Sequence, residues 1–295
     1  MANILTYQTS KKVKISQNLD PLLQRRSVAP GEAGMLAKTS QAINTAPEIK
    51  YSASKRGYIG SGASGIVNRV PNGDVVKSPW PGSRAVEARR DITTESLIYE
   101  KLGQHPRLIR ALDYDPEGCV LTMEYMQNGT LKDFLSVNNE AISTAQRLQW
   151  AKDATEGLQL LHDADVVHCD VEPKNFLLDS DLALKISDFS GSSLEGSRPS
   201  ACAGSRYSRP GFDFHRQQTV SDDLFGLGST IYFIMTGQIP FEDLPSDEVE
   251  RSYRAQVYPN VANVKFGSII RQCWDAEVTS AQEVYERLQD MESKD

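Results

Sequence analysis

The sequence predicts an α+β protein of two lobes, in which a small, mostly antiparallel β unit carrying one helix precedes a larger helical lobe. Three observations predict it. A glycine cluster near position 60 lies between short runs of β-forming residues. A charged amphipathic pattern follows over about 84–102, and apolar residues recur at helical spacing after Asn128-Gly129. We expect the β-rich lobe over about 51–126 and the helical lobe over about 127–292.

The β-rich lobe begins where Tyr58-Ile59 leads into the glycine cluster, and Ile66-Val67 forms the strand that follows. The segment 71–74, Pro-Asn-Gly-Asp, is a hairpin turn signal, so Val75-Val76-Lys77 should be the next strand. After the helix at 84–102 we expect two more strands near 109–114 and 119–125.

The helical lobe shows its period at Leu148, Ala151, Leu158 and Leu161. A short β segment over about 176–186 interrupts it, and a Gly/Ser-rich loop follows over 190–211. Apolar and amphipathic patterns then predict helices over about 222–235 and 280–290.

Residues 1–50 differ from the rest in composition and charge. They contain seven Lys or Arg and three acidic residues, a net charge of +4, so the remainder carries −11 of the total of −7. We expect a mostly disordered leader, with one short helix around 20–26. Its positive charge suits an acidic partner, whereas the acidic body argues against general nucleic-acid binding.

The compartment follows from what the sequence lacks. No apolar run approaches the roughly 20 residues that span a bilayer, and no secretory signal pattern opens the chain. Four scattered cysteines show no metal-binding spacing. We therefore expect a cytoplasmic or nuclear protein, with mitochondrial import as the alternative because the leader is basic.

The first chemical motif is Gly60-Ser61-Gly62-Ala63-Ser64-Gly65. Glycines let backbone N–H groups approach a polyphosphate closely. The pattern alone also fits a dinucleotide-binding turn or a plain glycine hairpin. Since β-formers and a turn follow rather than a helix, strand–loop–strand is favoured, as a flap over a nucleotide.

The second motif is Lys77 on the strand after the turn. A phosphate-binding lysine needs an anionic partner, and Glu95 is the candidate because Tyr99 and Leu102 share its helix face. Glu100 and Asp91 are the alternatives.

The third motif runs from His168 to Leu178 and contains Asp170 and Asn175, with Asp188-Phe189-Ser190 ten residues further on. An aspartate can orient and deprotonate an attacking hydroxyl. Asn175 and Asp188 supply the few oxygen ligands that Mg²⁺ prefers beside substrate phosphates.

In this order the motifs resemble those of the eukaryotic protein kinase family, from Ile59 to about Trp274. The HRDxxxxN loop corresponds to His168–Asn175 and DFG to Asp188–Ser190. The segment 221–228 is similar to the family's DxWSxG helix, and Cys273-Trp274 to a later landmark.

The resemblance implies ATP and Mg²⁺ as cofactors and a protein as substrate. Catalytic roles fall on Asp170, Lys77, Glu95, Asn175 and Lys174, and metal binding on Asn175 and Asp188. The nucleotide-binding set implied is Ile59, Gly60, Ser61, Gly62, Ala63, Ser64, Gly65, Val67, Val75, Lys77, Met123, Glu124, Met126 and Leu177.

Several positions depart from the family pattern. Cys169 replaces an arginine that pairs with a phosphorylated activation loop, so such phosphorylation should not be the switch. Ser190 replaces the DFG glycine, which should restrict the backbone while leaving Asp188 available. Val75 replaces an alanine and should tighten the adenine wall.

Glu172 stands where serine/threonine kinases place a lysine on the γ-phosphate. The sequence leaves open whether Lys174 supplies the positive charge that is missing at position 172. Arg209-Pro210-Gly211 lacks the APE glutamate, and the arginine that pairs with it is absent too. Losing both partners leaves no stranded charge, so the domain should still fold.

Three functions remain. The first is a serine/threonine protein kinase, since Lys77, Glu95, Asp170, Asn175 and Asp188 are all present. The second is a pseudokinase that serves as an ATP-binding or scaffold module. The third is a small-molecule kinase, disfavoured by the segment 204–207, which suits peptide docking.

Overall fold

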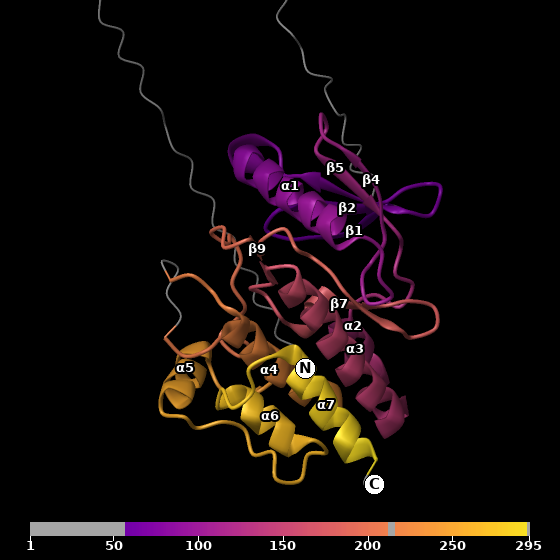
Figure 1. Cartoon of the computed structure of the whole chain (residues 1–295). Helices are drawn as coiled ribbons and strands as arrows, with labels where there is room; N and C mark the ends of the chain where they lie inside the picture. The colour runs from indigo at the N-terminus through magenta and orange to yellow at the C-terminus, as the bar shows by residue number, and fades with distance from the viewer. Residues whose placement is uncertain (1–56, 212–215, 294–295) are drawn as a thin grey trace, which may run out of the picture. The chain divides into compact units, whose positions relative to one another are not determined.

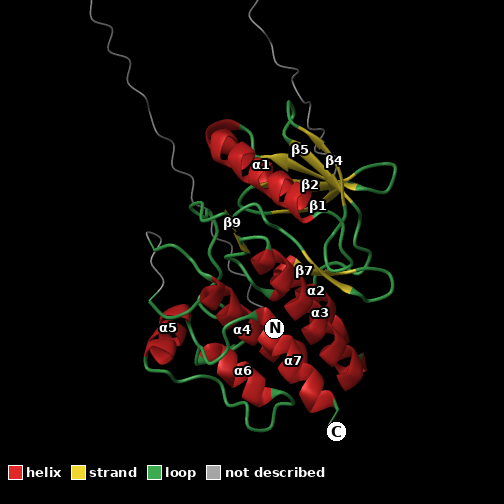
Figure 2. Cartoon of the chain, in the orientation of Figure 1, coloured by secondary structure: helices red, strands yellow, loops and turns green. Residues whose placement is uncertain are grey.

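The fold is described by a computed structural model for residues 57–211 and 216–293, all within one compact unit, Ile49–Asp295. An antiparallel sheet with one helix forms the first lobe, and a group of helices forms the second (Figures 1 and 2). The two-lobed α+β architecture predicted from the sequence is therefore confirmed. The expected leader and its short helix lie outside the described residues.

The sheet of the first lobe has the strand order β1-β2-β3-β5-β4, with every neighbouring pair antiparallel. Its strands are β1 (Tyr58–Ser61), β2 (Gly65–Arg69), β3 (Val75–Pro79), β4 (Ala111–Asp115) and β5 (Val120–Met123). The last two strands begin one or two residues later than the sequence predicts. The glycine cluster is thus a strand–loop–strand element, as expected.

One helix, α1 (Ala85–Leu102), packs against β3, β4 and β5 and carries Glu95 (Figure 1). It agrees with the predicted range. A short 3₁₀ turn, Gly82–Arg84, precedes it. The helix ends at Gly103, whose φ of 67° places it in the left-handed region that glycine tolerates and whose N–H bonds the Tyr99 carbonyl.

The second lobe contains six α-helices among the described residues, and helix-forming patterns predict only the longer ones. They are α2 (Leu131–Asn138), α3 (Thr144–Asp163), α4 (Val220–Thr236), α5 (Ser246–Arg254), α6 (Gly267–Trp274) and α7 (Ala281–Glu292). The helices α2, α5 and α6 were not predicted individually, and each is only eight or nine residues long. Two turns of helix carry too little periodicity to identify one.

Side-chain caps fix where the longer helices start. Ser143 accepts a bond from the Gln146 N–H at the start of α3. Thr219 and Asp222 form a reciprocal capping box at the start of α4. Ser280 caps α7 through the Glu283 N–H.

Two small two-stranded sheets accompany the helices of the second lobe. The strand β6 (Val166–Val167) pairs with β9 (Ser193–Leu194), and β7 (Phe176–Leu178) pairs with β8 (Leu184–Ile186). The loop 168–175, between β6 and β7, includes the 3₁₀ turn Pro173–Asn175. Both ends of this loop are therefore fixed by strand pairing.

Asp223 of α4 anchors the beginning of the loop 168–175 through hydrogen bonds to its backbone. Its carboxylate, 2% exposed, accepts bonds from the N–H groups of His168 (2.7 Å) and Cys169 (2.9 Å). A third contact joins it to His162 Nε2 at 3.0 Å. Cys169 has a φ of 69°, a costly conformation for a side-chain-bearing residue, which these bonds help to hold.

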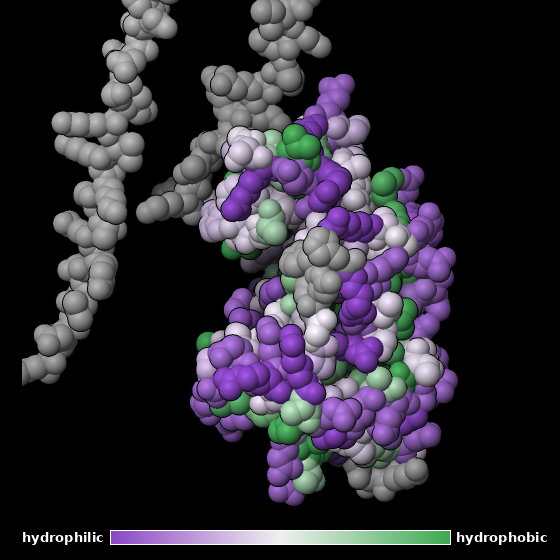
Figure 3. Space-filling view, turned by 90° about the vertical axis from the view of Figure 1, so that its left-hand side faces the viewer, coloured by the Kyte–Doolittle hydropathy of each residue, from purple (hydrophilic) through white to green (hydrophobic). Residues whose placement is uncertain are grey.

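The surface gives no sign of a large apolar face on the side drawn in Figure 3. That face is mostly hydrophilic, and its hydrophobic residues lie in small separate patches. Within the described ranges, no helix combines the length and apolarity needed to cross a bilayer.

Removing the Asp223 carboxylate should destabilise the second lobe. Asp223→Ala leaves two buried N–H groups and the His162 ring without their acceptor, so we expect a loss of about 3 kcal/mol in the free energy of unfolding. Urea denaturation followed by circular dichroism measures it. The control Asp247→Ala removes an exposed carboxylate that pairs with Arg251 one turn along its own helix. It should lower the free energy of unfolding by less than about 1 kcal/mol. Equal losses would show that Asp223 is no anchor.

Candidate functional site

One face of the sheet gathers four of the predicted side chains. Val75 and Lys77 are two residues apart on β3, so they point to the same side. Val67 of β2 is the cross-strand partner of Lys77, and Met123 of β5 is that of Val75. Directly paired residues share a face of the sheet, so three apolar side chains surround the lysine on one surface.

Lys77 bonds two carboxylates from different parts of the chain. Its Nζ lies 2.7 Å from Glu95 Oε2 on α1 and 2.6 Å from Asp188 Oδ1, which follows β8. The second oxygen of Glu95 accepts the N–H of Phe189 at 3.3 Å. Glu95 is therefore the partner of Lys77, as predicted. The alternatives are excluded, since Asp91 pairs with Arg90 and Glu100 is exposed.

Charge and burial oppose each other in this triad. Burial alone would lower the pKa of the Lys77 ammonium, but the negative charges of Asp188 and Glu95 outweigh it and raise the pKa. Burial raises the pKa of Glu95, whose side chain is 1% exposed, more than Lys77 lowers it. For Asp188, with a side chain 39% exposed, the Lys77 charge overcomes burial and the pKa lies below its usual range. The lysine thus holds its charge, and Asp188 is the carboxylate that ionises readily.

An aromatic series joins this triad to the loop 168–175. The ring of Tyr99, one turn after Glu95 on α1, lies 4.9 Å from the ring of Phe189 between centroids. Phe189 in turn meets the edge of His168 at 5.7 Å. Two hydrogen bonds fix the orientation of the His168 ring: Nδ1 accepts the Asp170 N–H, and Nε2 donates to the Ser187 carbonyl.

Asp170 lies in this loop with two donors on its carboxylate. The Asn175 amide donates to Asp170 Oδ2 at 2.9 Å and to its carbonyl at 2.7 Å. The Lys174 ammonium lies 3.2 Å from Oδ1 and 3.1 Å from Oδ2. The structure therefore places the Lys174 ammonium beside the Asp170 carboxylate. The sequence alone leaves open whether Lys174 supplies positive charge there.

Glu172 shares that lysine and also reaches the segment after β9. Its Oε2 lies 3.3 Å from Lys174 Nζ, and its Oε1 accepts the N–H of Gly204. The negative charge that replaces a lysine here is consequently not left free. It is neutralised in part by Lys174 and ties the loop 168–175 to residue 204.

Together these neighbours set the basicity of Asp170. Burial raises its pKa to about 6, and the charge of Glu172 adds to this while Lys174 opposes it. Groups with a pKa near working pH suit proton transfer, because a useful fraction is ionised and still basic. Asp170 is thus suited to act as a general base.

Asn175 and Asp188 retain the oxygens that Mg²⁺ would use. The Asn175 side chain donates through its nitrogen, which leaves its Oδ1 free to coordinate. Asp188 Oδ1 is held by Lys77, which leaves Oδ2. In residues 57–211 and 216–293 no three His, Cys, Asp or Glu form a complete cage. This partial set fits Mg²⁺, which commonly binds through one or two protein oxygens plus substrate phosphates.

The remaining predicted nucleotide contacts differ in their exposure. Ile59 is 46% exposed, and the loop residues 61–63 are exposed as well. Ser64 and Gly65 are buried instead, and a Cβ on Gly65 would lie only 2.2 Å from the Ser78 carbonyl oxygen. Glycine is required there by close approach of β3.

The segment that follows β5 has backbone groups that could bind a ligand. Within the described ranges, neither the Glu124 carbonyl nor the Met126 N–H has a hydrogen-bond partner, although the Glu124 side chain is held by Arg110 and Lys185. Leu177, on β7, is half-buried. These groups are available for the adenine contacts that the sequence predicts.

One expectation about Ser190 is wrong in part. Its hydroxyl donates to Asp188 Oδ1 at 2.8 Å, so Asp188 is not left entirely available. A hydroxyl two residues from a carboxylate can reach it where the backbone turns, and the φ of 63° at Asp188 that allows this is not visible in the sequence. The anchoring bonds of Asp223 and the Glu172–Gly204 bond were also missed.

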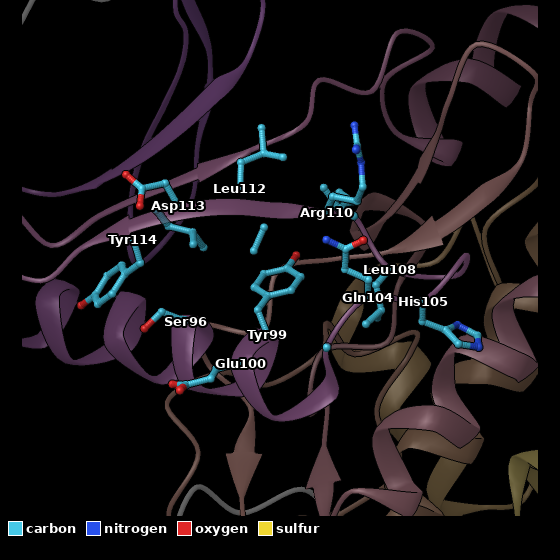
Figure 4. A pocket seen from close by; sticks show the side chains of 14 residues that line it. Ser96, Tyr99, Glu100, Gln104, His105, Leu108, Arg110, Leu112, Asp113 and Tyr114 are labelled. Atoms are coloured by element: carbon cyan, nitrogen blue, oxygen red, sulfur yellow. The ribbon is translucent and has the colours of Figure 1, made fainter.

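A separate cavity lies between α1 and the strands β4 and β5, and Tyr99 is one of its lining residues (Figure 4). It has a volume of about 360 Å³ and is lined by α1, the turn after it and β4. Figure 4 shows the Tyr99 hydroxyl pointing into it, and this buried hydroxyl has no hydrogen-bond partner among the described residues. Lys77, Asp170 and Asp188 do not line it, so it is not the candidate site.

Comparison with known families gives one broad match. The model of the protein kinase domain matches residues 53–294 of the chain, which covers both lobes and every residue of the candidate site.

Individual relatives share about a quarter to a third of their aligned residues with the chain. The chain is 31% identical over 210 residues to the probable serine/threonine-protein kinase PBL28 of Arabidopsis thaliana, covering 65% of this chain and 56% of that protein. It is 26% identical over 215 residues to the ephrin type-B receptor 4b of Danio rerio, covering 68% of this chain and 22% of the receptor. The chain thus spans between about a fifth and just over half of the relatives it matches.

The Asp170 carboxyl should titrate near pH 6, well above the ordinary aspartate value of about 4. Carbon-13 NMR of aspartate-labelled protein measures it, with Asp170→Asn identifying the resonance. Glu172→Gln should move the midpoint to lower pH because a repelling charge is lost, and Lys174→Met should move it to higher pH. A wild-type midpoint near 4, or shifts of the opposite sign, would contradict the site described above.

Proposed function

The chain belongs to the protein kinase family, and from that premise we propose that it transfers the γ-phosphate of ATP, with Mg²⁺, to serine or threonine hydroxyls of protein substrates. The single observation that carries the proposal is the meeting of Lys77, Glu95 and Asp188 in one bonded triad opposite the Asp170–Asn175 pair. Such transfer depends on positioning and charge rather than on a covalent intermediate.

Binding of ATP falls to the sheet face and the segment after β5. Val67 and Val75 would lie on one side of the adenine and Leu177 on the other, with Glu124 and Met126 offering backbone groups to its edge. Lys77, once the nucleotide enters, would hold the α- and β-phosphates while Glu95 keeps its position. Glycine-loop N–H groups would contact the phosphate oxygens.

Transfer of the phosphoryl group falls to the loop 168–175. Asp170 would accept the proton of the attacking hydroxyl and hold that oxygen in line with the γ-phosphorus. Lys174, 3.1 Å from this carboxylate, would supply positive charge beside the transferring group. Bound Mg²⁺, held by Asn175 and Asp188, would neutralise charge that develops on the phosphates.

A protein, rather than a small molecule, is the substrate that we favour. Glu172 joins the segment 203–209 to the loop 168–175. Arg206 joins the same segment to residues 241–244, because its guanidinium donates to the carbonyls of Phe241 and Leu244. This gives an ordered surface beside Asp170 on which an extended peptide can lie. The Arabidopsis relative, a probable serine/threonine-protein kinase, supports serine or threonine as the acceptor.

The main alternative is an ATP-binding scaffold without transfer. It is favoured by Glu172, which shares Lys174 with Asp170, and by Ser190, which occupies one oxygen of Asp188. We also propose a cytoplasmic or nuclear location, supported by the four free cysteines, which suit a reducing compartment.

Replacing Asp170 should separate transfer from binding. Asp170→Asn keeps the bond to Asn175 but removes the base, so we expect kcat to fall by about 10² to 10⁴ with ATP affinity within a few-fold of wild type. Radiolabelled phosphate transfer from Mg-ATP to a generic protein substrate, with phosphoamino-acid analysis, measures rate and acceptor together.

The matched control is Asp181→Asn, an exposed carboxylate on the turn between β7 and β8, which should retain wild-type activity within twofold. Equal, background-level transfer by wild type and Asp170→Asn, with both binding ATP, would establish the scaffold instead.

Phosphorylation of the segment after Asp188 should not switch activity. Cys169 is a buried neutral thiol that donates to the Val167 carbonyl, and burial raises its pKa. It therefore cannot pair with a phosphate. Replacing the exposed Ser197 and Ser200 by alanine should change the transfer rate less than twofold. A loss of tenfold or more would reveal another phosphate receptor.

A further inference from the structure

The glycine-rich loop is bonded directly to the residue that replaces the DFG glycine. Ser64 Oγ donates to Ser190 Oγ at 2.9 Å, across 126 positions of sequence. Both residues are buried, with exposures of 3% and 8%. A hydrogen bond between buried hydroxyls is protected from competing water, so this one holds the two segments together.

The bond continues to the metal-binding carboxylate. Ser190 donates its own proton to Asp188 Oδ1 at 2.8 Å, and Lys77 donates to the same oxygen at 2.6 Å. Two donors fill the acceptor positions of Oδ1. The Ser190 hydroxyl and Lys77 thus fix the orientation of the Asp188 carboxylate and leave its Oδ2 for a ligand.

The loop is compact and lies close above that second oxygen. Gly62 donates to the Gly65 carbonyl at 3.0 Å, and the Trp80 indole donates to the Gly62 carbonyl at 2.9 Å. A methyl carbon built on Gly62 would lie only 4.0 Å from Asp188 Oδ2.

On the side of Gly62, the space next to Oδ2 leaves little room for a metal-bound phosphate. A Mg²⁺ ion lies about 2 Å from each oxygen that it binds. An aspartate oxygen, metal and phosphate oxygen in sequence therefore need about 4 Å, before any contact distance to the loop. A phosphate placed between Oδ2 and Gly62, with the metal, would therefore require the loop to lift from Asp188.

We propose that Ser190 is a positioning residue for Asp188 and that, with Ser64, it forms a clasp holding the glycine-rich loop over the site until Mg-ATP displaces it. The clasp opposes nucleotide binding by the strength of one buried hydrogen bond, and it keeps Oδ2 directed at the metal. The identity of the ligand rests on the proposed function, whereas the clasp itself belongs to the ligand-free protein.

Ser64→Ala breaks the loop end of the clasp and leaves the Ser190–Asp188 bond intact. In ligand-free protein, hydrogen–deuterium exchange of amides 62–65 should become about three- to tenfold faster, the effect of losing roughly 1 kcal/mol. The dissociation constant for Mg-ATP should fall by a similar factor, because no clasp has to be broken.

Ser190→Ala removes both bonds and separates the two roles. Exchange of the loop should match that of Ser64→Ala, and adding Ser64→Ala to it should change nothing further, which a double-mutant cycle detects. In addition kcat should fall relative to Ser64→Ala, because Asp188 loses the donor that orients it. Thermal denaturation checks that each variant is folded.

The control for exchange is Ser61→Ala, which removes an exposed hydroxyl whose hydrogen bond within residues 57–211 and 216–293 is with Tyr58; amides 62–65 should then exchange at the wild-type rate. Unchanged exchange in Ser64→Ala, or weaker Mg-ATP binding by it, would overturn the clasp. If no variant and no wild-type protein binds nucleotide, the proposed function fails, and the exchange rates still decide whether the clasp exists.

Discussion

The Lys77 ammonium, bonded at once to Glu95 and Asp188, is the interaction on which the rest of the site depends. It joins the sheet, α1 and the segment after β8 through one buried positive charge. A buried charge is tolerable only with partners of opposite sign, so neither carboxylate can move away without large cost. The relative placement of the sheet and the helical lobe at this point is therefore set by electrostatics, and the aromatic series from Tyr99 to His168 extends the same alignment to the catalytic loop.

The second constraint acts from the opposite side, where Asp223 holds the backbone of His168 and Cys169. With strand pairing at both ends, this leaves the loop 168–175 little freedom, and Asp170 is presented at a fixed place. Its neighbours Glu172 and Lys174 then tune its charge. The departures from the family pattern are compensated locally: Glu172 gains a lysine and a backbone N–H, and the segment that lacks the APE glutamate is held by Arg206 and by the bond of Arg209 to Ser221.

Much of the fold and the site could be predicted because their signals are local. The turn at 71–74, the helix face shared by Glu95 and Tyr99, and the five-residue spacing of Asp170 and Asn175 are all visible in short windows of sequence. The contributions of Ser190 and Asp223 were missed because they depend on backbone geometry and long-range contact. Ser190 reaches Asp188 in a structure where Asp188 has a φ of 63°, and Asp223 meets residues more than 50 positions away. The short helices were missed because tertiary packing, rather than periodicity, stabilises them.

The most direct test is a crystal structure with Mg²⁺ and a non-hydrolysable ATP analogue. The account requires the analogue between the glycine-rich loop and Leu177, with Lys77 Nζ within hydrogen-bond distance of an α- or β-phosphate oxygen and Mg²⁺ bound by Asn175 and Asp188. A nucleotide bound elsewhere, or a metal that avoids Asp188, would contradict it.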